Sequence, residues 1–366
     1  MIVTRPCYCT REQVRRALDV KLGAYANEQV DRAIMSAADA VEGLTQRRFY
    51  PEDGVRKYDW PDAQRAYPWR IWFGIYELAA QPTQVVTGTF LPSPIVIPIN
   101  AIIFHPVNEG PPFTRMELRR DLNNAFGGGT TPQQDIGITG TFGYWTKTKA
   151  AGTVAVTQQA SDSTITVSDG VSVGVGDVLI AGTERMIVTD AGFVDTTVAF
   201  SGLSSASAQD NIVMVSDGTK FAQGEVLLVD AEWMMILQIM GNTMIVRRAW
   251  DGSILAAHTG GTLWARRSLS VLRGQLGTTA AIHNQGTALS VSEVPSLIRQ
   301  LAIAEAQVWL TQEQGAYGGA SAPQKIVSVN RGGYAVSEQV AGAGLLDIRQ
   351  RVAESRFTRK IRKWSV

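Results

Sequence analysis

Three histidines are the residues of this 366-residue chain best suited to acid–base or metal chemistry: His105, His258 and His283. An imidazole titrates near neutral pH and ligates zinc, so a histidine beside paired carboxylates would indicate catalysis or metal binding. His258 and His283, however, occupy equivalent places in an internal repeat, each between an alanine-rich stretch and a Gly-Thr pair. A residue copied together with its loop more often structures that loop, so we expect a structural role.

Sequence motifs for catalysis are missing. The chain has no His-Glu-x-x-His zinc motif and no Gly-x-Ser-x-Gly turn, and its glycine-rich segment 127–131 lacks the lysine of a phosphate-binding loop. Cys7 and Cys9 lack further zinc ligands and are too close for an easy disulfide, so we expect reduced thiols near a mobile terminus. The acidic residues of segment 151–246 lack the spacing of a calcium loop. We therefore expect no enzyme, no metal and no cofactor.

Aromatic side chains crowd the segment 58–76. They could stack on nucleic-acid bases, or they could be buried in a core or against another subunit, where aromatic residues supply much of the contact energy. The local charge is mixed, which favours burial. The residues expected in a core or a subunit interface are Tyr58, Trp60, Trp69, Trp72 and Phe73.

A basic segment closes the sequence. Residues 349–366 carry seven basic groups against Glu354, while the whole chain has a net charge of only +1, so an acidic body precedes a basic tail. Apolar residues alternate with these charges at helical spacing, which is typical of a helix that docks an apolar stripe into a groove. The predicted docking arm comprises Leu345, Ile348, Arg349, Arg351, Val352, Arg356, Phe357, Arg359, Lys360, Ile361, Arg362, Lys363 and Trp364.

An internal repeat identifies the middle of the chain as β-structure. Val167-Ser168-Asp169-Gly170 returns 48 residues later at 215–218, and Glu184 and Met186 return at the same offset as Glu232 and Met234. A shared offset across separate patches indicates a duplicated structural unit. A smaller echo, at an offset of 25, relates Arg248 and His258 to Arg273 and His283. We interpret this echo as a further extension of the block by copied hairpins and loops.

Helical patterns flank the repeat. Apolar residues recur at three- and four-residue steps in segments 10–22, 27–48, 294–312 and 345–363, whereas alternating residues in 136–144 predict a strand. The prediction is an α+β fold: a helical bundle frame with an inserted, internally duplicated all-β domain. Its expected domains are 1–150 with N-terminal helices and short strands, 151–290 with the duplicated β insertion, and 291–366 with the later helix and the basic arm.

Two of these segments resemble a known family. The helix ending Ala40-Val41-Glu42-Gly43-Leu44-Thr45-Gln46-Arg47-Arg48-Phe49 and the strand Ile138-Thr139-Gly140-Thr141-Phe142-Gly143-Tyr144 resemble those of tailed-bacteriophage head–tail connector proteins of the adaptor type. The helix 294–312 is similar to the later helix of that family. In shorter members this strand and helix nearly abut, so residues 150–290 are interpreted as an insertion.

The resemblance implies a structural function. A connector subunit forms a homo-oligomeric ring, commonly of twelve copies, that binds the portal protein on one side and neck or tail-terminator proteins on the other. DNA passes through the lumen without sequence-specific binding. The portal-facing role falls on the arm that begins at Leu345. The expected location is the neck of the virion after synthesis in the host cytoplasm, and no apolar run or signal-peptide core indicates a membrane.

An alternative function remains open from the sequence. Duplicated β modules could belong to a tail or baseplate protein that binds a glycan on the host surface. Trp233, Trp250 and Trp264 would supply the aromatic platforms, and the idea requires that these side chains are not buried in the module cores.

Overall fold

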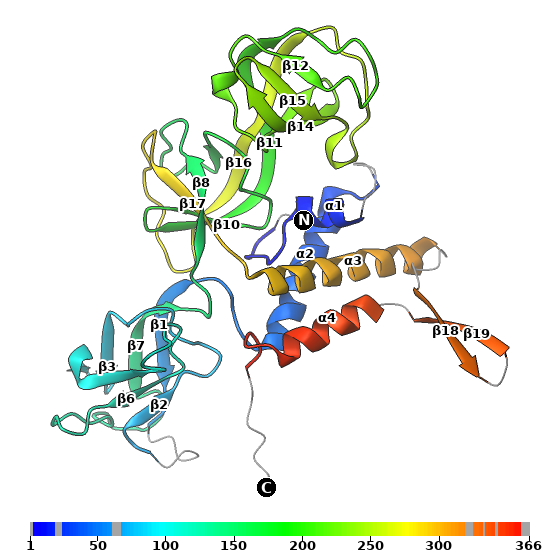
Figure 1. Cartoon of the computed structure of the whole chain (residues 1–366). Helices are drawn as coiled ribbons and strands as arrows, with labels where there is room; N and C mark the ends of the chain where they lie inside the picture. Colours follow the sequence, from blue (N-terminus) through cyan, green and yellow to red (C-terminus); the bar gives the residue numbers. More distant parts are fainter. Residues whose placement is uncertain are drawn as a thin grey trace. The chain divides into compact units, whose positions relative to one another are not determined.

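The computed structural model describes residues 3–18, 24–60, 67–318, 325–331, 334–340 and 343–359 (Figure 1). The chain divides into two compact units, which we describe separately. Unit 1 combines Met1–Thr45, Thr148–Gln275 and Thr279–Thr358, whereas unit 2 combines Gln46–Lys147, Leu276–Thr278 and Arg359–Val366.

The predicted fold class is wrong, because strands rather than helices dominate the chain. The described residues contain four α-helices, and 21% of the chain is helical against 35% in strands. The helices begin near their predicted positions, but the last one, predicted over 345–363, ends at Glu354, and residues 355–359 are not helical. The error arose because the short strands expected before residue 150 were treated as part of a helical frame, whereas the strands of segment 46–147 build two sheets around a core of their own.

Unit 1 contains the four helices. They are α1 (Arg11–Leu18), α2 (Asn27–Thr45), α3 (Ser296–Gly318) and α4 (Ala343–Glu354). The apolar stripe predicted for α2 is buried, as Val30, Ile34 and Val41 show, and α2 packs along α3. Between α3 and α4 the chain forms a hairpin of β18 (Lys325–Arg331) and β19 (Tyr334–Val340), which the sequence pattern did not predict.

A ten-stranded antiparallel sheet forms the β part of unit 1. Nine strands follow the order β12-β15-β14-β13-β16-β11-β10-β17-β8, and β9 pairs with β16. Their bounds are β8 Thr148–Thr153, β9 Thr164–Thr166, β10 Val178–Ala181, β11 Glu184–Phe200, β12 Ile212–Met214, β13 Val226–Val229, β14 Glu232–Met240, β15 Thr243–Arg247, β16 Gly261–Gln275 and β17 Ala288–Ser292. The long strands β11 and β16 pair along most of their length.

The two sequence offsets belong to one duplication, in which one copy is inserted into the other. We call residues 148–192 with 268–292 the split module, and residues 193–267 the nested module. In the split module Thr164 pairs with Ser270; in the nested module the positions 48 residues later and 25 residues earlier, Ile212 and Ile245, form the same pair. The echo at an offset of 25 is therefore the second half of the same repeat and not an additional copy.

Each module has its own hydrophobic core. The core of the nested module includes Val213, Leu227 and Met234, and that of the split module includes Ile165, Leu179 and Met186, which are the corresponding residues. The ribbon of β11 and β16 connects the two cores (Figure 1). Stability in this region therefore comes from two similar small β units.

The N-terminal segment attaches the helices to both modules through charged contacts. Arg11 binds Asp31 of α2 and Asp190 of β11 at 2.8 and 2.7 Å, and Glu12 forms an ion pair with Arg266 of β16. Cys7 donates its backbone N–H to Gly176 at 2.9 Å. Cys7 and Cys9 are free thiols, as predicted, but they are buried, so the terminus is held against the module here.

Unit 2 consists of two small sheets. A four-stranded sheet has the order β1-β7-β3-β4 and a three-stranded sheet the order β2-β6-β5. The bounds are β1 Glu52–Tyr58, β2 Arg70–Trp72, β3 Gln84–Thr87, β4 Ile95–Ile97, β5 Ile102–His105, β6 Arg115–Leu118 and β7 Ile136–Phe142. The predicted strand at 136–144 is thus confirmed as β7, with Ile136, Ile138 and Phe142 in the core.

Candidate assembly surface

The two repeated histidines lie in buried charge clusters, one in each module. Glu232 pairs with Arg248 through two hydrogen bonds of 2.7 Å and contacts His258 Nε2 at 3.0 Å. Glu184 pairs in the same way with Arg273, at 2.7 and 2.8 Å, and contacts His283 Nε2 at 2.8 Å. Both glutamate side chains are fully buried.

These clusters fix the loops that carry them. Glu232 accepts two backbone N–H groups, from Ala249 and Ala256, while Arg248 donates to backbone carbonyls at Ser205 and Asp210. In the split module, Gly274 and Ala281 donate to Glu184, and Arg273 donates to the carbonyls of Gln159 and Asp162. The repeated histidines thus contact the glutamates that hold these loops, which agrees with the structural role expected from the sequence.

The glutamates of these clusters are held in the charged form. Burial alone would raise the pKa of Glu184, but Arg273, two backbone N–H groups and His283 together lower it to about 2. The same balance, with burial opposed by Arg248, two N–H groups and His258, lowers the pKa of Glu232 to about 2. A carboxylate held so firmly is a poor proton shuttle, so the geometry fits a structural role.

The third histidine is in unit 2. His105 Nε2 lies 3.7 Å from Glu117, which also binds Arg70 and Arg115. Burial lowers the pKa of His105, and the neighbouring Arg115 lowers it further. Among the described residues no group of three or more histidine, cysteine or acidic side chains is arranged to hold a metal ion.

The aromatic cluster builds the core of unit 2. Phe73 is buried, and Tyr58, Trp60 and Trp69 pack against the core around it. Trp72 is half-buried and lies beneath Arg115, whose guanidinium is 5.1 Å from the ring centroid. Trp60 also covers the glycine loop, because a Cβ at Gly127 would collide with its ring. This placement accounts for the cluster by intramolecular packing.

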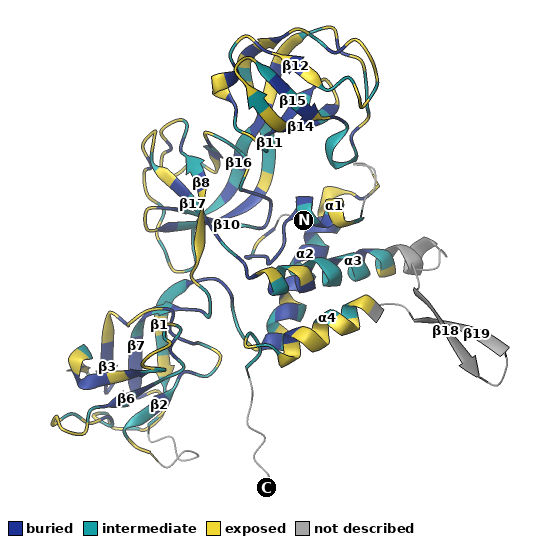
Figure 2. Cartoon of the chain, in the orientation of Figure 1, coloured by how far each residue is buried: buried dark blue, intermediate teal, exposed yellow. Residues whose placement is uncertain are grey.

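The described part of the predicted arm packs on the other helices of unit 1. Val352 is fully buried, Leu345 and Ile348 are half-buried, and α4 contacts both α2 and α3. Arg349 binds Glu305 of α3 through two hydrogen bonds of 2.5 and 2.8 Å. The apolar stripe is thus used inside the chain. The outward side of α4 is exposed (Figure 2) and includes Arg351.

The rest of the arm continues this basic character. Arg356 is exposed, Phe357 is half-buried, and Arg359 is the last described residue. The predicted arm residues Lys360, Ile361, Arg362, Lys363 and Trp364 lie outside the described residues. We define α4 and residues 355–358 as the arm surface.

The three tryptophans proposed for glycan binding do not form one platform. Trp233 is half-buried and packs edge-on against Phe193 at 5.2 Å, and Trp250 is half-buried with Arg16 5.1 Å from its ring centroid. Trp264 is exposed, at 42% of its surface. A glycan surface on the modules would therefore depend on one ring.

The sequence analysis missed the Glu–Arg–His clusters, although their signal was present. Glu184 and Glu232 recur at one offset, and the arginine–histidine pairs recur at the other. Two offsets that transfer a glutamate, an arginine and a histidine together indicate a cluster that was copied with a duplicated module. The fact that the second offset runs in the opposite direction was the signal of the nested arrangement.

Comparisons with protein-family models, curated proteins and solved structures gave no match. No helix among the described residues has the length and apolar character needed to cross a lipid bilayer.

Proposed function

We propose that this protein is a structural subunit of a bacteriophage head–tail connector, which assembles into a homo-oligomeric ring between the portal and the neck. One observation carries the proposal: α2 and α3, the two helices on which the resemblance rests, pack against each other although the duplicated modules separate them in sequence. Contact between two helices that residues 46–295 separate in sequence is compatible with an adaptor subunit built on this helical layer.

Side-chain contacts make these helices one packed layer. Arg32 of α2 binds Glu313 of α3 at 2.9 Å, and Arg349 of α4 binds Glu305 of α3. Val352 fills the space that α4 shares with its neighbours. The arm surface therefore starts from an anchored helix, and further basic residues follow it in the sequence. Such a terminus suits an acidic surface on a portal or neck protein.

The packing of α4 on the other helices limits where the chain can be shortened in a test of portal binding. Ending the chain before α4 would remove Val352 and uncover the apolar surface of α2 and α3, so a loss of binding would not be informative. A deletion that ends at Arg359 retains α4 and removes only the seven residues from Lys360 onward. We expect this deletion to form rings in negative-stain electron microscopy but to lose capture by purified portal protein.

Two further variants separate charge from apolar contact. One replaces Lys360, Arg362 and Lys363 by glutamine, and the other replaces Ile361 and Trp364 by alanine. The docking hypothesis expects both to weaken portal capture, because it assigns contact energy to both kinds of residue. A full-length chain that stays monomeric at all concentrations and does not label the virion neck would overturn the proposed function.

A further inference from the structure

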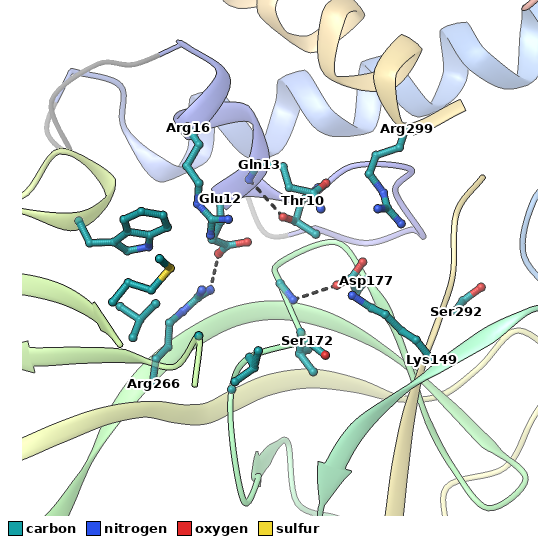
Figure 3. A pocket seen from close by; sticks show the side chains of 18 residues that line it. Thr10, Glu12, Gln13, Arg16, Lys149, Ser172, Asp177, Arg266, Ser292 and Arg299 are labelled. Atoms are coloured by element: carbon teal, nitrogen blue, oxygen red, sulfur yellow. Dashed lines mark hydrogen bonds and ion pairs between the residues drawn. The ribbon is translucent and has the colours of Figure 1, made fainter. Parts of the chain in front are cut away.

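A polar cavity of about 120 Å³ lies within unit 1, between the N-terminal segment, the two modules and the first turn of α3 (Figure 3). The N-terminal segment contributes Thr10 and Glu12, the split module contributes Lys149 and Asp177, and α3 contributes Arg299. A cavity needs about 10–15 Å³ to hold one water, so this one has room for a small ion.

Two basic groups in the cavity wall are not neutralised by a direct ion pair. Arg16 is paired with Asp251 and Arg266 with Glu12. In the described part of the chain, by contrast, no carboxylate forms an ion pair with Lys149 or Arg299, and the guanidinium of Arg299 donates to the carbonyl of Val294 at 3.1 Å. The cavity therefore retains two cationic donors.

A buried hydroxyl in the same wall also lacks a partner. Ser292 is 7% exposed, and its Oγ has no hydrogen-bond partner among the described residues. Leaving a buried polar group unsatisfied is unfavourable, so such a group indicates that a water or a ligand belongs beside it. Ser292 of β17 and Lys149 of β8 come from paired neighbouring strands and lie at the same end of the cavity as Arg299 (Figure 3).

The nested module has an ion pair at the position equivalent to Asp177 of the split module. Glu225 corresponds to Asp177 at the offset of 48, and Glu225 is neutralised by Arg267 at 2.6 Å. Asp177 instead accepts the N–H of Gly174 at 2.9 Å, and the charges near it are those of Lys149, Glu12 and Arg299, of which Glu12 is already paired with Arg266. One carboxylate facing two cations leaves one positive charge in excess.

We infer that this cavity binds a small oxyanion of the phosphate class, held by Lys149, Arg299 and the hydroxyl of Ser292. The ligand must present several acceptor oxygens, because all three protein groups can donate hydrogen bonds. Its negative charge offsets the excess positive charge of the wall. Since Arg299 belongs to α3 and the other two residues to the split module, the bound anion joins the helices to the β part of the unit.

The test is isothermal titration calorimetry of the full-length chain with inorganic phosphate, at constant ionic strength and with chloride as the reference anion. The expected result is saturable binding of one phosphate per chain. Lys149→Gln and Arg299→Gln should each weaken it by about tenfold or more. Lys149 lies on an exposed part of its strand, so its substitution should leave the fold intact. Lys220→Gln, an exposed lysine of the nested module, is the matched control and should bind like the unchanged protein.

Ser292→Ala separates a ligand-binding role from a structural one. Removing an unsatisfied hydroxyl should leave the thermal midpoint of the phosphate-free protein unchanged or raise it, while phosphate binding weakens. Titration with phenyl phosphate then distinguishes two sources of the phosphate group. If phenyl phosphate binds as tightly as inorganic phosphate, the cavity has room for the rest of a larger ligand. If only inorganic phosphate binds, the ligand is a free ion. Heats that do not saturate, or equal affinity in both charge variants, would overturn the inference.

Discussion

At the scale of single residues, two of the three histidines and their glutamate partners lie in buried charge clusters. Glu184 and Glu232 each organise an arginine, a histidine and two backbone N–H groups inside a module. Buried charges of this kind are tolerated when every hydrogen-bonding group is satisfied, and they are costly when one partner is missing. The clusters are therefore the places where a single substitution should do most damage.

Glu232→Gln should destabilise the protein by about 3–5 kcal/mol, because it leaves the buried guanidinium of Arg248 without its charge partner. Thermal and urea unfolding of the full-length chain would measure the loss. Asp230→Asn is the matched control: Asp230 also contacts His258, at 2.8 Å, but its side chain is 78% exposed. Solvent around the exposed Asp230 carboxylate limits its contribution to about 0–1 kcal/mol, so equal losses for the two variants would contradict the buried-cluster interpretation.

The same carboxylates should make the protein sensitive to acid. The pKa of Glu184 and of Glu232 falls from the ordinary 4.5 to about 2 on folding. A lowered folded-state pKa stabilises the fold above the unfolded-state pKa, and that contribution is lost as the pH falls from about 4.5 towards 2. We expect the thermal midpoint to fall across this window, and to fall less steeply in Glu184→Gln than in the unchanged protein. Parallel curves would count against the assignment.

The two thiols should be inert in the folded protein. Burial raises the pKa of Cys7 and of Cys9 well above the ordinary value, and a thiol that stays protonated and enclosed reacts slowly. Titration with a disulfide reagent at pH 8 should detect almost no free thiol in the native chain and both thiols in denaturant. Rapid reaction without denaturant would show that segment 7–9 opens readily from the split module.

At the scale of the elements, the sequence predicted where helices and strands occur better than it predicted how long they are. The helices near 11, 27, 296 and 343 and the strands of both repeats follow from apolar periodicity, which local sequence carries. The length of β11 and β16 does not, because seventeen- and fifteen-residue strands depend on each other as pairing partners. The extension of α3 through Gly315 also runs against a local helix-breaking signal.

The candidate site was predicted only in part for the same reason. A basic amphipathic helix could be recognised near Leu345, but sequence alone could not show that Val352 packs on the chain's own helices. An apolar stripe predicts burial without naming what covers it. The cavity around Ser292 was invisible to the sequence, because its wall combines segments near residues 10, 149, 177 and 299.

The modules also provide an internal test of which surface residues the fold requires. On the outward side of the nested sheet, Ile212 is 57% and Met214 is 60% exposed, whereas the corresponding residues of the split module are Thr164 and Thr166. Ile212→Thr and Met214→Thr should therefore change stability by less than about 0.5 kcal/mol. Urea unfolding of the full-length chain would show whether the apolar side chains contribute to the fold.

The buried neighbour on the same strand provides the comparison. Val213→Thr places a hydroxyl in the core of the nested module and should cost about 1–3 kcal/mol. If the exposed substitutions cost as much as this one, the outward face would belong to the folding core after all, and the equivalence of the two modules would be limited to their backbones.

At the scale of the whole molecule, the duplication explains why the sequence pattern was easy to detect but its arrangement was not. A tandem repeat and a nested repeat give the same offset for their first halves. They differ in the direction of the second offset, which maps Arg273 of the split module back to Arg248 of the nested one. Sheet registers decide between them, because Thr164 pairs with Ser270 across the whole inserted module. The nested module, residues 193–267, is therefore complete before the chain re-enters the split module at residue 268.

A nested module should be able to fold alone. All residues of its core, from Val198 to Ala265, lie within 193–267, together with the Glu232–Arg248–His258 cluster and the Glu225–Arg267 ion pair. The fragment 193–267 should therefore be a folded β domain with a single cooperative urea transition, of about 3–5 kcal/mol as expected for a core of this size. Circular dichroism in the far ultraviolet, followed through urea, measures both properties. Because Glu232→Gln is expected to cost a similar amount, the same fragment with that substitution should lose the transition. A fragment that is collapsed but unfolds without cooperativity would mean that the modules stabilise each other through the β11–β16 ribbon and form one domain.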